Sequence, residues 1–253
     1  MIEQIIDGAV ARLWLDRPSV RNALDEQLIA ILTTTLHSLA AREDIHVVVL
    51  AGRGDAFCAG GDLRWMQRMA KASRPENIQD ALGLAGLFQA LDSLPQPTVA
   101  RIHGACVGGA LGLVSACDIA VAADNARFTL SEVRLGLVPA TISPYVLRAI
   151  GHRAASRYML TAETFGAHIA RQIGLVHEVA AESALDQTVD TLIATLLEGG
   201  RYAQGSTKRL LRELQGRQID EPIVRRTAEV IADARASNEA QQRLRQFFEK
   251  RRS

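Results

Sequence analysis

The chain has 253 residues, of which 48% are hydrophobic and 23% charged, and its formal net charge at pH 7 is +1. This composition is typical of a globular protein with a sizeable core, arranged as one domain or two. The near-neutral charge gives no electrostatic basis for binding nucleic acid, and the longest apolar runs, such as 47–51, are too short to span a bilayer. Neither a nucleic-acid partner nor a membrane partner is therefore expected.

Two further features favour a cytoplasmic location. The first residues, Met1 to Gln4, lack the basic region and apolar core of a secretory signal. The three cysteines, Cys58, Cys106 and Cys117, form no closely spaced metal-binding pair, so no metal site is expected and free thiols in a reducing compartment are the simplest interpretation. Cys58 and Cys106 lie in glycine-rich segments where a nucleophile is conceivable, but no histidine stands in a recognisable partner motif.

The first two thirds of the chain predict strands that alternate with helices. Residues 2–6 and 9–15 flank Asp7-Gly8 and predict a β-hairpin. Apolar residues at helical spacing predict a helix over 24–41, capped by Asp25. Later strands are predicted at 47–51, 98–102, 118–123 and 127–129, with helices near 63, over 78–94 and over 109–116, and a mobile polar connection at 71–77. This alternation is typical of the α/β class.

The pattern changes after residue 182. From 183 to 253 no convincing strand is found, and apolar residues recur at helical spacing around 192–197, 210–214 and 223–231. The sequence therefore predicts an α/β core over 1–182, followed by a helical C-terminal region over 183–253 with three or four amphipathic helices.

Two glycine-rich segments are the most informative feature of the chain. Residues 57–63 come after the strand-like run 47–50, and residues 103–110 come after the run 98–102. Glycine allows a close approach to the backbone, and the free N–H groups at a helix N-terminus favour negative charge. Two such ends that converge would form an oxyanion hole from main chain alone. Each segment by itself would more often serve only packing and turns.

Together with later motifs, these segments resemble the crotonase, or enoyl-CoA hydratase/isomerase, superfamily. The two glycine-rich segments are followed in the family's order by Ser131-Glu132 and by the run 135–139, and the likeness extends over roughly 13–179. The resemblance implies a spiral of β-β-α units with a helical trimerisation region, and a homotrimer or a dimer of trimers. It also implies an acyl-CoA thioester substrate, with no cofactor beyond the CoA that the substrate carries.

The resemblance also assigns roles to individual residues. It places the two oxyanion N–H donors at Gly61 and Gly109, and proton transfer at Glu132. A solvated surface charge is an equally good interpretation of Arg21. The substrate-binding positions that the resemblance implies are Arg21, Ala23, Ala59, Asp62, Leu63, Trp65, Gly108, Ser131 and Pro139.

The acid–base residues depart from the family pattern. Hydratases of the family generally use two glutamates, and Gly112 stands where the first is expected. Asp118 resembles the family's structural aspartate. We expect Leu130, Val133 and Leu137 to enclose the Glu132 carboxyl and to raise its pKa, as a proton shuttle requires. A single glutamate at this position also resembles the 3,2-enoyl-CoA isomerases.

A finer likeness favours hydration over isomerisation. Residues 61–66, 130–140 and 142–146 resemble the bacterial methylglutaconyl-CoA hydratases of leucine catabolism and the related isohexenylglutaconyl-CoA hydratases, some of which carry glycine at the first glutamate position. The expected function is hydration of an α,β-unsaturated CoA thioester, 3-methylglutaconyl-CoA or a related branched substrate. An isomerase, or a catalytically weak acyl-CoA- or RNA-binding protein, remains the alternative.

Overall fold

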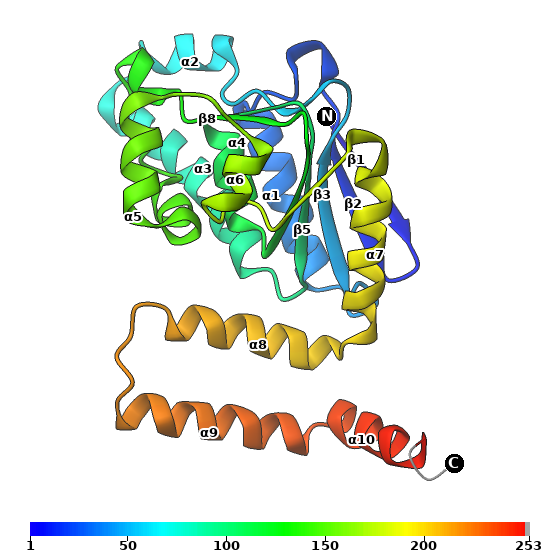
Figure 1. Cartoon of the computed structure of the whole chain (residues 1–253). Coiled ribbons are helices and arrows are strands. Elements are labelled where there is room, and N and C mark those ends of the chain that lie inside the picture. The colour runs from blue at the N-terminus through cyan, green and yellow to red at the C-terminus, as the bar shows by residue number, and fades with distance from the viewer. Residues whose placement is uncertain (251–253) are drawn as a thin grey trace.

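The computed structural model describes residues 1–250, in which two β-sheets are surrounded by helices (Figure 1). The larger sheet begins with an antiparallel hairpin, and its remaining strands are parallel. This arrangement confirms the predicted hairpin and the α/β class. Its order is β1 (Ile2–Asp7), β2 (Val10–Leu15), β3 (Val47–Gly52), β5 (Thr98–Ile102), β7 (Ile119–Ala123) and β10 (Glu178–Ala180).

The smaller sheet corrects the sequence analysis. Its order is β4 (Ala56–Cys58), β6 (Ala105–Val107), β8 (Arg127–Thr129) and β9 (Phe165–Gly166). Each glycine-rich segment therefore contains a short strand that was not predicted: β4 overlaps the start of 57–63, and β6 lies within 103–110. β4 and β6 have three residues each, which is too short for a periodic pattern to reveal.

Seven helices in the region up to residue 198 pack around the sheets. They are α1 (Glu26–Ala40), α2 (Leu63–Met69), α3 (Arg74–Ser93), α4 (Gly109–Ala116), α5 (Ser143–Thr161), α6 (Ala167–Gln172) and α7 (Leu185–Glu198). The side chain of Asp25 caps α1, as predicted. α3 begins at Arg74, so the prediction of a mobile connection over 71–77 is wrong. Ser73 and Glu76 form a capping box that starts this helix within a polar stretch.

The core lies on both faces of the larger sheet. All six residues of β3 are buried. Val48 and Leu50 pack in a large apolar cluster with α1, α3 and α4, whereas Val47 and Val49 pack with residues of α7 on the opposite face. Burial on both faces explains why β3 reads as a continuous apolar run.

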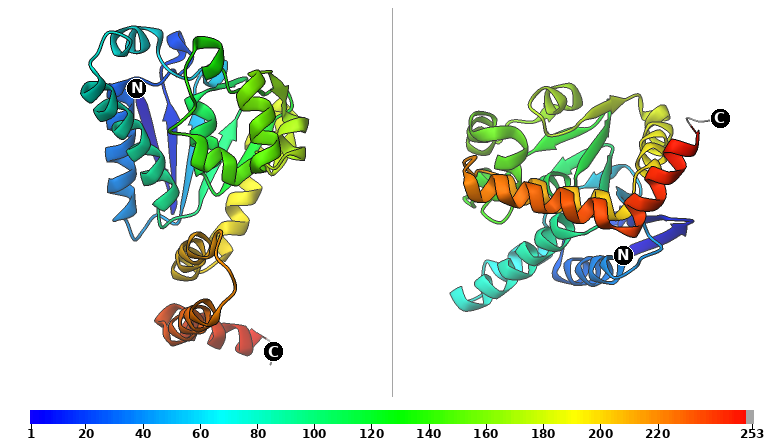
Figure 2. Two further views of the ribbon diagram at one scale, coloured as in Figure 1. Left: turned by 90° about the vertical axis from the view of Figure 1, so that its left-hand side faces the viewer. Right: turned by 90° about the horizontal axis from the view of Figure 1, so that it is seen from below.

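The C-terminal helices are α8 (Arg201–Leu214), α9 (Glu221–Ala236) and α10 (Asn238–Lys250), and α9 and α10 lie beyond α8 from the core (Figure 2). They confirm the predicted helical character of this region, of which residues 251–253 lie outside the described residues. α7, however, packs on the sheet, and the predicted boundary at 182/183 stays a prediction. None of the described helices is long and apolar enough to cross a membrane.

Candidate active site

The first glycine-rich segment lies beside residues 21–24. The amide of Ala59 donates to the Arg21 carbonyl at 2.9 Å. Leu24 makes two bonds: its amide donates to the Gly60 carbonyl at 2.7 Å, and its carbonyl accepts from the amide of Asp62 at 2.7 Å. These two bonds form a parallel β-bridge between Leu24 and Gly61. Because the bridge uses the Gly60 carbonyl and the Asp62 amide, the N–H of Gly61 itself is directed away from Leu24. No acceptor for it is found among the described residues, as the predicted role requires.

Asn22 holds the turn that aligns these two segments, and the sequence analysis missed it. The residue is fully buried and left-handed, with φ of 57°. Its Nδ2 lies 2.8 Å from the carbonyl oxygens of Arg53 and Ala56 and 3.2 Å from that of Phe57. An asparagine in a short polar turn is the signal that could have identified it, because asparagine tolerates this conformation better than most residues.

The second glycine-rich segment meets the first at Leu24. Gly108 has φ of 54° and donates its N–H to the Thr129 carbonyl at 2.8 Å. Gly109 is the first residue of α4, where an N–H has no acceptor within the helix. A Cβ atom on Gly109 would lie 3.1 Å from Leu24 Cδ1. Leu24 thus borders both predicted donors, Gly61 and Gly109, although their convergence on one oxygen stays a prediction.

The carboxyl group of Glu132 lies against Gly108. A Cβ atom on Gly108 would stand 3.1 Å from Glu132 Oε1 and 3.9 Å from Ser131 Oγ. Oε2 of Glu132 is buried and has no hydrogen-bond partner among the described residues. Burial raises the pKa of Glu132, and a hydrogen bond with its own backbone opposes this in part. The direction of the pKa shift agrees with the one expected of a proton shuttle.

The residues expected to enclose Glu132 differ in exposure. Leu130 is fully buried, whereas Leu137 is 49% exposed, so the enclosure of the carboxyl group by Leu137 stays a prediction. Gly136 has φ of 70° after the short 3-10 helix Glu132–Leu135, and the chain turns there toward the surface. Glu132 begins this 3-10 helix, and its carboxyl group lies against Gly108.

Gly112 lies one helical turn after Gly109 on α4, and it has no room for a side chain. A Cβ atom there would stand 2.5 Å from Ile142 Cγ2 and 2.7 Å from the Phe88 ring. Real Cβ atoms do not approach other atoms so closely. Phe88 and Ile142 therefore fill the place at which a second acid–base side chain was expected.

Three predicted binding residues cluster at the start of α2, and two of them have evident structural partners. Asp62 caps α2 by accepting from two N–H groups of its first turn, and its other oxygen lies 3.5 Å from Arg17. Trp65 is 8% exposed and its Nε1 donates to Asp80 at 2.8 Å. Leu63, in contrast, is 74% exposed and could contact a bound molecule.

Two further predicted binding residues, Ala23 and Pro139, make structural hydrogen bonds through their backbone carbonyls, whereas Arg21 exposes its side chain. Ala23 is buried, and its carbonyl accepts from Arg17 at 2.6 Å. Pro139 is also buried, and its carbonyl accepts from the Ser143 hydroxyl at 2.6 Å. The Arg21 side chain is 65% exposed and its Nε lies 3.5 Å from Asp55. It is free either to meet a phosphate or to remain solvated.

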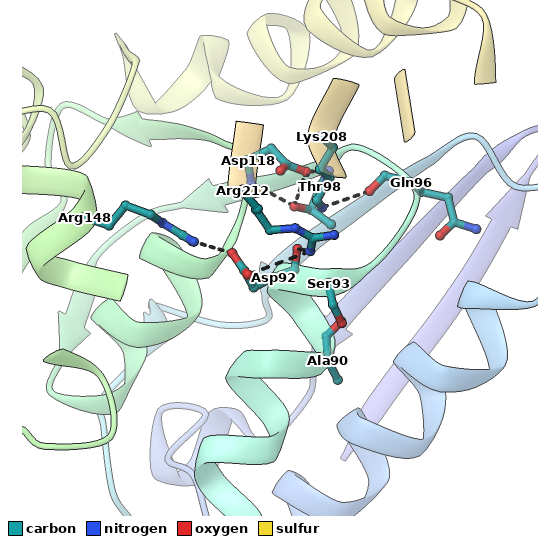
Figure 3. Close-up of polar contacts among 9 residues, drawn as sticks. All are labelled: Ala90, Asp92, Ser93, Gln96, Thr98, Asp118, Arg148, Lys208 and Arg212. Carbon is teal, nitrogen blue, oxygen red and sulfur yellow. Dashed lines mark hydrogen bonds and ion pairs between the residues drawn. The ribbon is translucent and has the colours of Figure 1, made fainter. Parts of the chain in front are cut away.

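Cys58, Cys106 and Asp118, the other residues considered for catalysis, are either fully buried or held in structural contacts. Cys58 and Cys106 are fully buried, and burial raises the pKa of Cys58 to about 12 and that of Cys106 well above its ordinary value. Asp118 accepts from the amide and hydroxyl of Thr98 at 2.8 Å and pairs with Lys208 at 2.6 Å (Figure 3). These contacts give Asp118 a structural role that joins α8 to the sheet.

The sequence and the fold are similar to those of known proteins. The family model described as enoyl-CoA hydratase/isomerase matches residues 6–253. The crystal structure of an enoyl-CoA hydratase from Shewanella pealeana is 42% identical, with a TM-score of 0.96, and the match covers 98% of this chain and 93% of that one. Enoyl-CoA hydratase AKT6-1 of Alternaria alternata is 34% identical over 88% of this chain and 76% of its own length.

A third relative, the hydroxycinnamoyl-CoA hydratase-lyase of Pseudomonas fluorescens, is 34% identical over 76% of this chain and 71% of its own length. The chain belongs to the enoyl-CoA hydratase/isomerase family and has its crotonase fold. It is an enzyme of the enoyl-CoA hydratase type.

Proposed function

We propose that the protein adds water across the double bond of an α,β-unsaturated CoA thioester. The observation that carries this proposal is the half-buried Glu132 carboxyl, which lies against Gly108 and whose buried Oε2 has no partner among the described residues. Gly109 follows directly and begins α4, and Leu24 links it to Gly61. The Glu132 carboxyl thus lies against the residue that precedes the predicted donor Gly109, which supports a role in proton transfer.

The proposed reaction proceeds through an enolate. The N–H groups of Gly61 and Gly109 bind the thioester oxygen, and each such donor in an oxyanion hole contributes about 2.7–4 kcal/mol. Ionised Glu132 accepts a proton from water as the water oxygen bonds to C3, and negative charge moves to the thioester oxygen. Protonated Glu132 then donates that proton to C2 as the enolate collapses. One carboxyl group serves both steps, because Gly112 offers none.

The substrate class is the finer part of the proposal. A glutaconyl-type thioester, such as 3-methylglutaconyl-CoA, carries a distal carboxylate that an arginine could anchor. Arg64 on α2 and Arg134 beside Glu132 are both exposed and stand on segments that flank the candidate site. One well-oriented charged contact should raise kcat/KM for this thioester at least about tenfold above that for crotonyl-CoA. Equal values, or a preference for crotonyl-CoA, would refute this anchoring.

Isomerisation is the second candidate, and the single carboxyl group favours it. A 3,2-enoyl-CoA isomerase would use Glu132 alone to move a proton between C4 and C2 of the acyl chain. Hydration leaves solvent oxygen in the product, whereas isomerisation does not. Turnover in ¹⁸O-labelled water with crotonyl-, 3-methylcrotonyl-, 3-methylglutaconyl- and 3-enoyl-CoA therefore separates the two reactions. Turnover of the 3-enoyl substrate alone, without label in the product, would replace the hydratase proposal.

We also infer that the protein acts in the cytoplasm as a homotrimer or a dimer of trimers, with no cofactor beyond the CoA of its substrate. The C-terminal helices expose many large apolar side chains, and such surfaces need burial. These side chains are Leu211, Val224, Ile231, Leu244, Phe247 and Phe248. A monodisperse monomer by light scattering at micromolar concentration would contradict this assembly.

A further inference from the structure

Asp92 joins three helices at the last turn of α3. Its carboxylate pairs with Arg148 of α5 and lies 3.8 Å from Nη1 of Arg212 on α8 (Figure 3). The same Nη1 donates to the Asp92 backbone carbonyl at 2.5 Å. The Asp92 side chain is only 19% exposed. A partly buried carboxylate between two arginines makes a more rigid connection than a surface ion pair does.

Two of these helices also position the side chains of Phe88 and Ile142, which pack against Gly112 and are called here the wall at Gly112. Phe88 lies one turn before Asp92 on α3, and Ile142 directly precedes α5. The Tyr145 ring lies 5.8 Å from the Phe88 ring, and the Arg148 guanidinium lies 5.5 Å from the centre of the Tyr145 ring. A continuous line of contacts therefore leads from the Asp92 bridge to the surface of α4 at Gly112.

The wall at Gly112 is sensitive to small movements. Ile142 and Phe88 already occupy the place of a Cβ atom at 112, one helical turn from the Gly109 N–H. A shift of either side chain would alter the packing around α4 one turn from Gly109 and, under the proposed function, the room left for the acyl group. We propose that Asp92 is a positioning residue: its bridge to Arg148 and Arg212 holds the wall against Gly112 and couples the docking of α8 to the shape of the active site.

Lys208 provides a matched control for this proposal. It lies one turn before Arg212 on α8 and also ties this helix to the core, through Asp118 at 2.6 Å and the Gln96 carbonyl at 3.2 Å. Gln96 lies shortly before β5 and Asp118 directly precedes β7, so neither partner belongs to the turn of α3 that carries Phe88. A groove of about 1060 Å³ lies between α8 and the core, and the residues of both ion-pair groups line it.

A double-mutant cycle in urea unfolding tests the coupling without any substrate. Gly112→Ala should lower the unfolding midpoint strongly in the wild type. We expect this loss to shrink to less than about half in the Asp92→Asn background, where the wall can retreat, and to stay unchanged in the Lys208→Met background. Additive effects of Asp92→Asn and Gly112→Ala, or an equal rescue in both backgrounds, would overturn the proposal. If Asp92→Asn does not fold, Arg212→Met breaks the same bridge from α8 and serves instead.

A kinetic measurement tests the link to catalysis and rests on the proposed function. On any thioester that the wild type turns over, Asp92→Asn should lower kcat about tenfold with KM within about twofold, because the wall shapes the reacting geometry rather than CoA binding. Lys208→Met should leave kcat near the wild-type value. An unchanged kcat in Asp92→Asn would overturn the inference. Absence of turnover in the wild type itself would instead refute the proposed function, while the unfolding cycle would still decide the coupling.

Discussion

The Oε1 atom of Glu132 lies 3.1 Å from the point at which a Cβ atom on Gly108 would stand. The two residues are far apart in sequence, yet the absent side chain of one provides the room that the carboxyl group of the other occupies. Gly108 also has φ of 54° and ψ of −118°, a conformation that other residues rarely adopt. The same glycine therefore meets a backbone requirement and creates the space for the acid beside it.

Replacement of Glu132 by glutamine should abolish proton transfer while preserving the shape of the site. We expect turnover of the best substrate to fall about 10²–10⁴-fold, with CoA affinity little changed. Steady-state kinetics with the wild type and Glu132→Gln, together with calorimetric titration of CoA, measure both quantities. A variant that keeps more than about half of the wild-type rate would show that Glu132 is not the proton-transfer group.

The raised pKa of Glu132 also predicts a stability difference that depends on pH. Because burial disfavours the charged carboxylate, the unfolded chain ionises first as pH rises from the ordinary glutamate value of 4.5. The contribution of Glu132 to stability is therefore complete below this value and is lost as pH rises through the raised pKa. Glutamine does not ionise, so the Glu132→Gln variant does not lose this stability. The melting temperature of the variant minus that of the wild type should therefore increase as pH rises from 4 to 7. A difference that stays constant with pH would contradict this expectation.

Gly109→Val should disrupt the oxyanion hole. A Cβ atom at 109 would already stand 3.1 Å from Leu24 Cδ1, and the extra methyl groups would displace Leu24, which pairs with Gly61. We expect kcat/KM to fall about 10²–10³-fold, the loss typical when one oxyanion donor is removed. A structure with bound acyl-CoA provides the direct check. A thioester oxygen beyond hydrogen-bond distance of both Gly61 N and Gly109 N would make the assignment wrong.

Gly112→Ala should destabilise the fold by about 1–3 kcal/mol, the usual cost of overpacking a core. Gly86→Ala on α3 is the matched control, because a Cβ atom at 86 would have no neighbour within 4 Å. That control should be neutral, or stabilising by about 0.5–1 kcal/mol, since alanine favours a helix over glycine. Urea unfolding of both variants measures these changes. Equal effects would mean that the wall of Phe88 and Ile142 yields easily.

Much of the fold could be predicted from the sequence because its strands and helices leave periodic patterns. The run 47–51 is buried on both faces and therefore continuously apolar, and Asp25 marks the start of α1. The short strands β4 and β6 leave no such pattern. α5 was not predicted either, and Gly151 inside it has φ of 69°, which breaks the helical geometry that an unbroken periodicity assumes.

The candidate site could be predicted only where it requires particular residue types, such as glycine, at particular positions in the sequence. Glycines with positive φ, such as Gly60 and Gly108, are conspicuous, and Glu132 stands in a recognisable motif. The closed wall at Gly112 depends on Phe88 and Ile142, which lie on other elements and meet only in the folded chain. The sequence showed that a side chain was missing there, but not that its place was filled.

The ion pair between Lys208 and Asp118 has a consequence for the chemistry of the protein itself. Thioesters acylate free amines, and an enzyme that handles them is exposed to its own substrate. The chain contains only three lysines, Lys71, Lys208 and Lys250, and its arginines stay protonated at neutral pH and do not attack acyl groups. Lys208 is 8% exposed, and its ammonium group is held against a carboxylate. The basic character of this chain is thus carried almost wholly by groups that its acyl donor cannot modify.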